Sequence, residues 1–259
     1  MIAVHGGVQG DVSSQRLPAD AVPALFAYSL NRKVRKLYAG NYFRYRQESG
    51  GEFDYPANTP NLTENVFLVK VYDQKAKHGV PAQDAVQLDE SKQPKIDKDT
   101  LYKAVFNQRE YLDIANLAPL INQDFTITSI GNGAEAPRPM IGVWGNTDRL
   151  TVEPSDDVTR FLFNKNLGTI LDADGRVIQC VSGYSVIQNN QRALTLRTGD
   201  NTGHVTIAGQ DPNFLQISIG RENQRLYKGD FMESTMHLEQ LTSLGSDQLF
   251  QTTRQYYES

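Results

Sequence analysis

Some side chains in this sequence are of the kinds that bind metal ions. The four histidines, at positions 5, 78, 204 and 237, are scattered, and none forms the H-x-H or H-x-x-x-H spacing that places two imidazoles on one metal. Acidic residues cluster in "SDD" (155–157) and in "DADG" (172–175), where Asp172 and Asp174 could offer carboxylate oxygens to calcium. The "DADG" segment, within "DADGR" (172–176), fits a hairpin turn better than a calcium site. A structural calcium ion at Asp172 and Asp174 is nevertheless the one cofactor that the sequence offers as a candidate.

A second group of residues could bind a sugar or a protein partner. The stretch "NRKVRKLYAGNYFRYR" combines basic and aromatic residues, and after its glycine the side chains alternate in direction. Tyr42, Arg44 and Arg46 are expected on one face of a strand, opposite Phe43 and Tyr45. A nucleic-acid site would use the same residues, but the chain carries a net charge of −4, and nucleic-acid binders normally have a basic excess. We therefore expect Arg44 and Arg46 to form buried or interface ion pairs, and we keep both, with Tyr42, as candidates for carbohydrate or partner contacts.

Trp144 and Asp73 complete the set of candidate binding residues. Trp144, in "GVWGN", is the only tryptophan, and it is either a core residue or an exposed ring that stacks on a sugar or a partner. Asp73, in "VYDQ", is expected to anchor a loop by hydrogen bonds rather than to act in catalysis. The chain has a single cysteine, Cys180, which excludes an internal disulfide and argues against a cysteine-based zinc site.

The elements that must position these residues are mostly strands. Short alternating segments recur every 8 to 12 residues and are separated by Gly, Asn and Asp, which predicts an antiparallel β-sandwich of the jelly-roll type. Apolar residues at helical spacing (Phe26, Leu30, Val34 and Leu37) predict a helix near residues 22–38, and a second, short helix is expected near 246–257. Residues 1–20 are predicted to form an extended arm, and residues 21–259 a single lectin-like domain.

The composition limits the class of protein. Of 259 residues, 39% are hydrophobic, which is enough for a substantial core. The first residues lack a basic segment followed by an apolar one, and no run approaches the roughly 20 apolar residues of a membrane helix. The sequence therefore predicts a protein that is made in the cytoplasm and binds neither membranes nor nucleic acid.

The order of several segments resembles a known family. "AYSLNRKVRKLYAGNYFRYRQES" (27–49), "VFLVKVYDQ" (66–74), "QPKI" (93–96) and "AVFNQREYLDI" (104–114) look like the start of the catalytic-type domain of α-L-arabinofuranosidase B. They are also similar to related modules of tailed-phage virion proteins. The stretch 217–257 resembles the close of a laminin-G-like or concanavalin A-like jelly roll. The resemblance covers most of the chain and implies the same sandwich fold.

The catalytic residues of that family are matched only in part. The enzymes use a glutamate in an "E-N-N"-like segment and an aspartate in a "G-G-D-N" segment. Here "IGREN" (219–223) places Glu222 at the second carboxylate position, whereas "IQNN" (187–190) has Gln188 where the first would be. Glycoside hydrolysis needs two carboxylates, so the resemblance leaves Glu222 as the one weak catalytic candidate and predicts a protein that is not an enzyme.

The sequence thus favours a non-enzymatic structural protein of a bacteriophage virion, as a capsid decoration, head-fibre or tail/baseplate component. We expect it to be located in the virion after synthesis in the host cytoplasm, to pack on other virion proteins, and to form a homo-oligomer on the particle. Binding of a host-surface glycan is a further expectation. The alternative is a glycoside hydrolase of the arabinofuranosidase type.

Overall fold

The computed structural model describes most of the chain after residue 23. The described residues are 24–56, 62, 64, 66–75, 83–97, 102–114, 124–133, 136–145, 149–155, 158–163, 167–172, 179–188, 191–198, 201–208, 216–237 and 243–258. Most of them lie in antiparallel β-strands, which confirms the predicted fold class. The predicted arm at residues 1–20 lies outside the described part of the chain.

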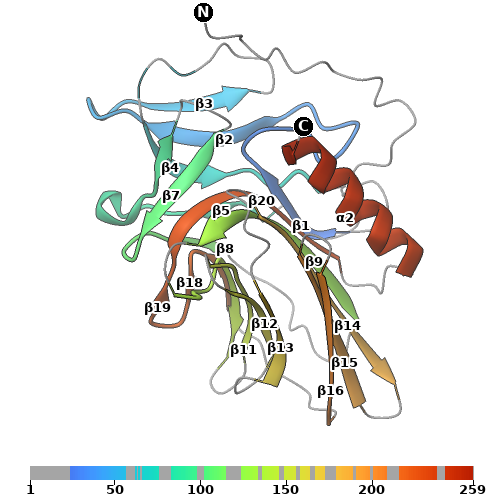
Figure 1. Ribbon diagram of the computed structural model, residues 1–259. Helices are drawn as coiled ribbons and strands as arrows, with labels where there is room; N and C mark the ends of the chain where they lie inside the picture. Colours follow the sequence, from blue (N-terminus) through green and yellow to red (C-terminus); the bar gives the residue numbers. More distant parts are fainter. Residues whose placement is uncertain are drawn as a thin grey trace, which may run out of the picture.

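One half of the molecule is a sheet that we call the β20 sheet (Figure 1). The registers pair β1 with β20, β20 with β9, and β9 with β14, and β15 and β16 follow in order. All of these pairs are antiparallel. The strands are β1 (Ala24–Ser29), β20 (Lys228–His237), β9 (Phe125–Gly133), β14 (Gln179–Gln188), β15 (Gln191–Thr198) and β16 (Asn201–Ala208).

The other half is the β10 sheet, whose order is β3, β2, β4, β5, β8, β17, β10, β11, β12 and β13. Two short strands, β6 (Lys95–Asp97) and β7 (Lys103–Asn107), connect β4 to β20, so the two halves form one continuous curled sheet. The strands of the β10 sheet are β3 (Glu52–Pro56), β2 (Asn41–Arg46), β4 (Val66–Val71), β5 (Ala85–Val86), β8 (Leu112–Ile114), β17 (Gln216–Ile219), β10 (Ile141–Trp144), β11 (Arg149–Glu153), β12 (Val158–Phe163) and β13 (Leu167–Asp172).

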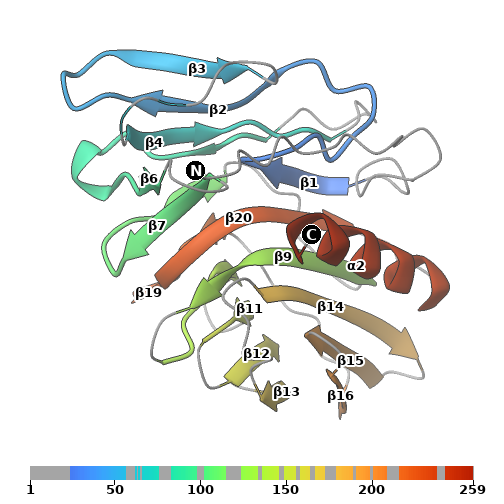
Figure 2. The same cartoon turned by 45° about the horizontal axis from the view of Figure 1, so that its top comes forward.

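The hydrophobic core lies between the two sheets. Phe125 of β9 and Phe161 of β12 are both buried, and their rings meet edge to face with centroids 6.2 Å apart. Arg192 of β15 is also buried, and its guanidinium lies 4.7 Å from the ring centroid of Phe163 on β12. Each of these contacts joins one sheet to the other. The chain is therefore a β-sandwich, and Figure 2 shows its layers from a second direction.

The predicted helix at 22–38 is wrong: the described residues of that range form strand β1 and a loop. Phe26 and Tyr28 enter the core at a period of two, and β1 pairs with β20 along its length. The amide of Val34, which a helix would bind to a carbonyl four residues earlier, donates instead to Oε1 of Gln74 at 3.0 Å. Leu37, the last member of the predicted apolar stripe, is 78% exposed. Tertiary pairing with β20 thus outweighs the local helical spacing.

The predicted C-terminal helix is confirmed as α2 (Ser243–Glu258), which begins three residues before the expected start. It lies on the outside of the β20 sheet (Figure 1). Phe250 and Tyr257 of α2 pack there against Ile130 of β9 and Met232 of β20. Among the described residues, no helix combines the length and the apolar character needed to cross a membrane.

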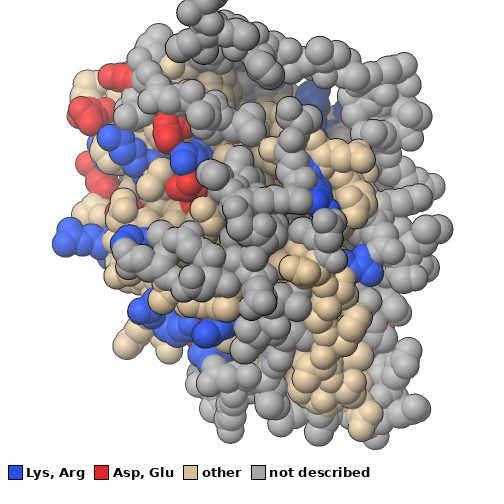
Figure 3. Space-filling view, viewed as in Figure 1, with Lys and Arg blue, Asp and Glu red and all other residues tan. Residues whose placement is uncertain are grey.

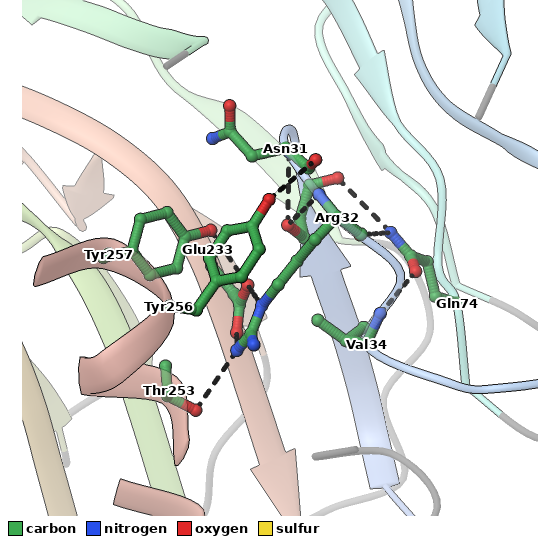
Figure 4. A network of polar contacts seen from close by, with 9 residues as sticks. Asn31, Arg32, Val34, Gln74, Glu233, Thr253, Tyr256 and Tyr257 are labelled. Atoms are coloured by element: carbon green, nitrogen blue, oxygen red, sulfur yellow. Dashed lines mark hydrogen bonds and ion pairs between the residues drawn. The ribbon is translucent and has the colours of Figure 1, made fainter. Parts of the chain in front are cut away.

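A buried ion pair attaches α2 to the loop after β1 (Figure 4). The Arg32 guanidinium donates to both carboxylate oxygens of Glu233 on β20, at 2.7 and 2.6 Å. The same guanidinium donates to the Thr253 hydroxyl at 3.2 Å and lies 4.6 Å from the ring centroid of Tyr256. Tyr257 donates its hydroxyl hydrogen to Glu233 at 2.9 Å. The first arginine of the basic run is therefore structural, and it connects three parts of the chain.

The charges of this pair support each other. Burial alone would lower the pKa of the Arg32 guanidinium, but Glu233 raises it above its ordinary value. Burial, reinforced by the negative charge of Glu233, raises the pKa of the Tyr257 phenol. Arg32 and Glu233 are 7% and 2% exposed, so water screens their attraction only weakly.

The strands that flank "DADGR" (172–176) are not partners in the described sheet. The register places β13 beside β12, whereas β14 pairs with β9 and β15. The hairpin that the sequence predicted at this segment would have joined two neighbouring strands, and the described registers do not pair β13 with β14. Residues 173–178 themselves, including the calcium candidate Asp174, lie outside the described part of the chain, and so does the side chain of Asp172.

Candidate functional site

A short hairpin covers the outer face of the β10 sheet at the position of Glu222. Its strands are β18 (Arg221–Glu222) and β19 (Arg225–Leu226). Beneath it lie alternate residues of β11: because Leu150 and Val152 enter the core, Arg149, Thr151 and Glu153 face outward. The hairpin turns this outer face into a buried layer, in which Thr151 and Glu153 are both 0% exposed.

Gly142 allows the hairpin to lie directly on β10. A Cβ atom at this position would be 2.1 Å from the carbonyl oxygen of Arg221 and 2.8 Å from Cβ of Glu222. Both distances are shorter than a non-bonded contact, and the nearer atom is backbone, which cannot rotate away. Only glycine therefore permits this approach of backbone to backbone. The turn at the hairpin tip places Asn223 at a φ of 53°, a left-handed conformation that asparagine adopts more readily than most residues.

Gly142→Ala is expected to lift the hairpin from β10 and to lower the free energy of unfolding by about 1–3 kcal/mol, as overpacking typically does. Thermal or urea-induced unfolding would measure the loss. Because the added methyl group changes no charge and no polar group, a normal unfolding midpoint would contradict the close approach of the hairpin to β10.

The main polar contact under the hairpin is a pair formed by Arg225 and Glu153. Nη1 and Nη2 of Arg225 donate to Oε1 and Oε2 of Glu153 at 2.6 and 3.0 Å. The Thr151 hydroxyl donates to Oε1 at 2.8 Å. Burial alone would lower the pKa of Arg225, but the hydrogen bonds and charge of Glu153 raise it. Both oxygens of Glu153 are thus occupied by partners within the chain.

Glu222 lies next to this pair. Its Oε2 is 3.4 Å from Nη1 of Arg225 and 3.5 Å from Nη1 of Arg149. Since Nη1 of Arg225 also lies 2.6 Å from Oε1 of Glu153, the two carboxylate oxygens can be no more than about 6 Å apart. That spacing resembles the roughly 5–5.5 Å of retaining glycosidases. Here, however, arginines lie against both carboxylates, where a glycosidase leaves them open to the substrate.

Trp144 and Arg221 lie at the edge of the same cluster. The Arg221 guanidinium donates to both oxygens of Asp113 at 2.8 Å. It lies 3.7 Å from the ring centroid of Tyr111 and 5.5 Å from that of Trp144. Trp144 is 7% exposed, which agrees with a buried residue rather than with an exposed stacking ring. A ligand contact by Trp144 stays a prediction.

The cluster brings together two of the predicted residues, Glu222 and Trp144, and adds partners that the sequence analysis missed. The missed residues are Asp113, Arg149, Glu153, Arg221 and Arg225. One signal was available, because "RENQR" has arginines on both sides of Glu222. Glu153 gave no such signal, since it is the last residue of an ordinary alternating strand.

The predicted residues on β2 lie in a different place, at the far end of the β10 sheet. Nε and Nη2 of Arg44 donate to Asp54 of β3 at 2.8 and 3.1 Å, and these hydrogen bonds hold the pKa of Asp54 below its ordinary value. Arg46 donates to Oε1 of Gln93 at 2.9 Å and lies 3.7 Å from the carboxylate of Glu90, in the 3₁₀ turn η1 (Glu90–Lys92). Both arginines thus meet carboxylates, but the Arg44–Asp54 pair is 38% and 34% exposed rather than buried.

Red and blue atoms lie side by side in Figure 3, over the region of β2 to β4. This mixture agrees with the ion pairs of the region, which include Lys70 with Asp84 at 3.4 Å. Tyr42, the third predicted residue of β2, is 7% exposed. The face of β2 that the sequence favoured for binding therefore has its arginines bonded internally and its tyrosine buried.

Asp73 anchors a loop, as expected. Its carboxylate accepts hydrogen bonds from the backbone amides of Ala27 at 2.9 Å, Lys75 at 3.1 Å and Gln83 at 2.9 Å. The ammonium group of Lys75 lies 3.5 Å away. Burial raises the pKa of Asp73, against the opposing effect of these donors. The side chain of the next residue, Gln74, accepts a hydrogen bond from the Val34 amide and donates to two backbone carbonyls. Asp73 and Gln74 together therefore stabilise β1 and the loop that follows it.

The described residues contain no group of three or more His, Cys, Asp or Glu side chains placed to hold a metal ion. Asp174 and the side chain of Asp172 lie outside the described part of the chain. The calcium candidate therefore stays a prediction.

Comparison with known proteins gives a fold and no family. No protein-family model matches the chain. No curated protein matches it either. Among solved structures, a mutant of a GH54 α-L-arabinofuranosidase soaked with 4-nitrophenyl α-L-arabinofuranoside superposes with a TM-score of 0.65 at 10% sequence identity. The match covers 88% of this chain and 62% of that enzyme, so the chain spans about three fifths of its length.

Two other solved structures are similar to a smaller degree. One is domain 4 of AbnA, a GH43 extracellular arabinanase from Geobacillus stearothermophilus in complex with arabinotriose, with a TM-score of 0.40, 11% identity, and coverage of 71% of this chain and 80% of that domain. The other is the lectin UEA-II complexed with galactose, with a TM-score of 0.31, 9% identity, and coverage of 69% and 94%. Only the arabinofuranosidase match, with its TM-score of 0.65, supports a shared fold, and at 10% identity that likeness extends to the β-sandwich fold alone.

Proposed function

We propose that this chain is a non-enzymatic structural protein of a bacteriophage virion that packs on neighbouring virion proteins and binds host-surface glycans. The observation that supports a binding role over catalysis is that arginine side chains lie against both carboxylates at the β18–β19 hairpin. Glu153 is fully buried and bonded at both oxygens, and Glu222 lies against Arg149 and Arg225. A glycosidase needs one carboxyl that gives a proton to the leaving group and one that reaches the sugar.

Two kinds of support stand behind the remaining parts of the proposal. The glycan-binding part is supported by the fold, which is that of a carbohydrate-active protein. The virion part rests on the sequence resemblance of 27–49 and 66–74 to tailed-phage modules. On the particle, the chain would act as a capsid decoration, head-fibre or tail/baseplate component, and as a homo-oligomer.

The absence of catalysis is testable with an aryl arabinofuranoside. We expect the purified chain to release 4-nitrophenol no faster than buffer does, because no carboxylate under the hairpin is open to the substrate. The alternative function, an arabinofuranosidase-type hydrolase, is favoured by the closeness of the two carboxylates, whose nearest oxygens are at most about 6 Å apart. Turnover by the native chain that disappears in Glu222→Gln would establish the alternative.

The virion role needs a separate experiment. Purified particles would be examined by mass spectrometry and by electron microscopy with a labelled antibody against the chain. We expect the protein at regular positions on the particle. Its absence from purified virions would refute the structural role, whatever the outcome of the hydrolysis assay.

A further inference from the structure

The two faces of strand β2 differ in the contacts that their side chains make. On one face Arg44 and Arg46 are bonded internally. The opposite face carries aromatic rings that run from the core toward the end of the β2–β3 hairpin. Phe43 stacks on Tyr55 of β3 with centroids 4.7 Å apart and planes within 4°. Further along, Tyr45 meets Phe53 with centroids 5.8 Å apart and planes 32° apart.

Exposure rises along this ladder of rings. Phe43 and Tyr55 are buried, at 0% and 6%, whereas Tyr45 is half-buried and Phe53 is 47% exposed. The Tyr45–Phe53 pair is therefore where the aromatic face of the hairpin leaves the core and reaches solvent. Figure 2 shows β2 and β3 together at the outer end of the sheet.

The hairpin turn holds the exposed ring in place. Gln47 donates its backbone amide to Gly51 at 2.9 Å, Gly50 donates to Gln47 at 3.0 Å, and Gly50 has a φ of 94°. A Cβ atom on Gly51 would lie 2.9 Å from the Phe53 ring and 3.7 Å from Oε1 of Gln47. The ring thus rests across Gly51, with a side-chain amide beside it.

Acidic residues flank the hairpin turn beside this ring pair. Burial, and after it the negative charge of Glu64, raises the pKa of the Tyr45 phenol. Glu48 and Glu52, which flank the turn, are exposed. A ligand that carries negative charge would be repelled from this end of the hairpin, whereas a neutral one would not.

We infer that Tyr45 and Phe53 form a stacking platform for a pyranose ring of a neutral glycan, with the side-chain amide of Gln47 placed to bind its hydroxyl groups. The inference rests on the glycan-binding part of the proposed function and names its site. An exposed aromatic face with a side-chain amide at its border matches a sugar ring, which has one apolar C–H face and a rim of hydroxyls. A stable protein partner would need about 800 Å² on each side, far more than two partly covered rings of roughly 150–250 Å² each can offer.

The test compares Phe53→Leu, which keeps an apolar side chain but removes the ring, with Phe53→Tyr, which keeps the ring. The probes are an array of neutral hexose and N-acetylhexosamine oligosaccharides together with sialylated and sulfated ones, followed by calorimetry with the best array ligand. We expect the native chain to bind neutral glycans and Phe53→Leu to bind them roughly tenfold more weakly or worse. Phe53→Tyr should bind within about twofold of the native chain.

Leu88→Ala is the matched control, because Leu88 is 82% exposed and lies outside the ring pair. Leu88→Ala should bind the glycan with the same affinity as the native chain. Circular dichroism should show that all variants are folded. Glycan binding that Phe53→Leu leaves unchanged, or binding only to sialylated or sulfated glycans, would overturn this site while leaving a glycan-binding protein. Failure of the native chain to bind any glycan would overturn the glycan-binding part of the proposed function, and this site with it.

Discussion

Arg32→Met is expected to lower the free energy of unfolding by about 3–5 kcal/mol, the usual effect of removing one partner of a buried ion pair. The methionine would fill much of the space but would leave the Glu233 carboxylate, 2% exposed, without its cation. Of the two side chains that bind Glu233 in Figure 4, only the Tyr257 hydroxyl would remain. The contacts of the guanidinium with Thr253 and Tyr256 would be lost as well, so α2 would be less firmly held. Urea-induced unfolding followed by circular dichroism measures the loss.

Two further variants separate the ion pair from other effects of the substitution. Arg44→Met removes an arginine from a bidentate pair whose members are 38% and 34% exposed, and it should cost about 0–1 kcal/mol. The double variant Arg32→Met with Glu233→Leu should recover part of the loss, because it leaves no unpaired buried charge. If Arg32→Met cost no more than Arg44→Met, the buried network would not be a main contributor to stability.

The second large effect is expected at Arg225. Arg225→Met should lower the free energy of unfolding by about 2–4 kcal/mol, somewhat less than at Arg32 because the Arg225 side chain is 29% exposed and partly screened by water. The reason is the same: Glu153 is 0% exposed, and both of its oxygens lose a donor. The variant should also loosen the β18–β19 hairpin, which faster amide hydrogen exchange at residues 221–226 would reveal.

Graded substitutions test whether geometry or charge matters at this site. Arg225→Lys keeps the charge but cannot form two parallel hydrogen bonds. Its free energy of unfolding should therefore lie between those of the native chain and Arg225→Met. Lys70→Met, in a partly exposed pair with Asp84 at 3.4 Å, should cost about 1 kcal/mol or less and serves as the control. Unchanged hydrogen exchange of the hairpin in Arg225→Met would contradict the role of this pair in holding it.

The strands of the fold could be predicted more fully than the contacts of the candidate functional site. The alternation of "NYFRYR" and "VFLVKV" indicated strands, and the positions of β2 and β4 follow it. The ion pairs of Arg44 and Arg46 were expected for the same reason, since charged residues on an alternating strand meet those of its neighbours. The partners of Glu222 were not foreseen, because β11 and the β18–β19 hairpin are separated by 72 residues at the Glu153–Arg225 contact.

The error at residues 22–38 has a similar origin. Phe26 and Leu30 have helical spacing, but Phe26, Tyr28 and Leu30 also alternate, and a short apolar run supports either structure. Strand β1 forms because β20 offers it a ladder of backbone hydrogen bonds and the core accepts both of its aromatic rings. The basic run that a helix would have left in solvent instead sends Arg32 inward to Glu233.

The sequence by itself determined the alternation of the strands, the C-terminal helix and the lack of an internal disulfide, because each follows from residues close together or from a simple count. The tertiary structure decided which face of each strand is covered and which charges meet. Arg32 and Glu233 are 201 residues apart, and no local pattern relates them. Their pairing, the burial of Glu153 and Trp144, and the exposure of Phe53 depend on how the curled sheet brings distant strands together, and only the folded chain fixes that arrangement.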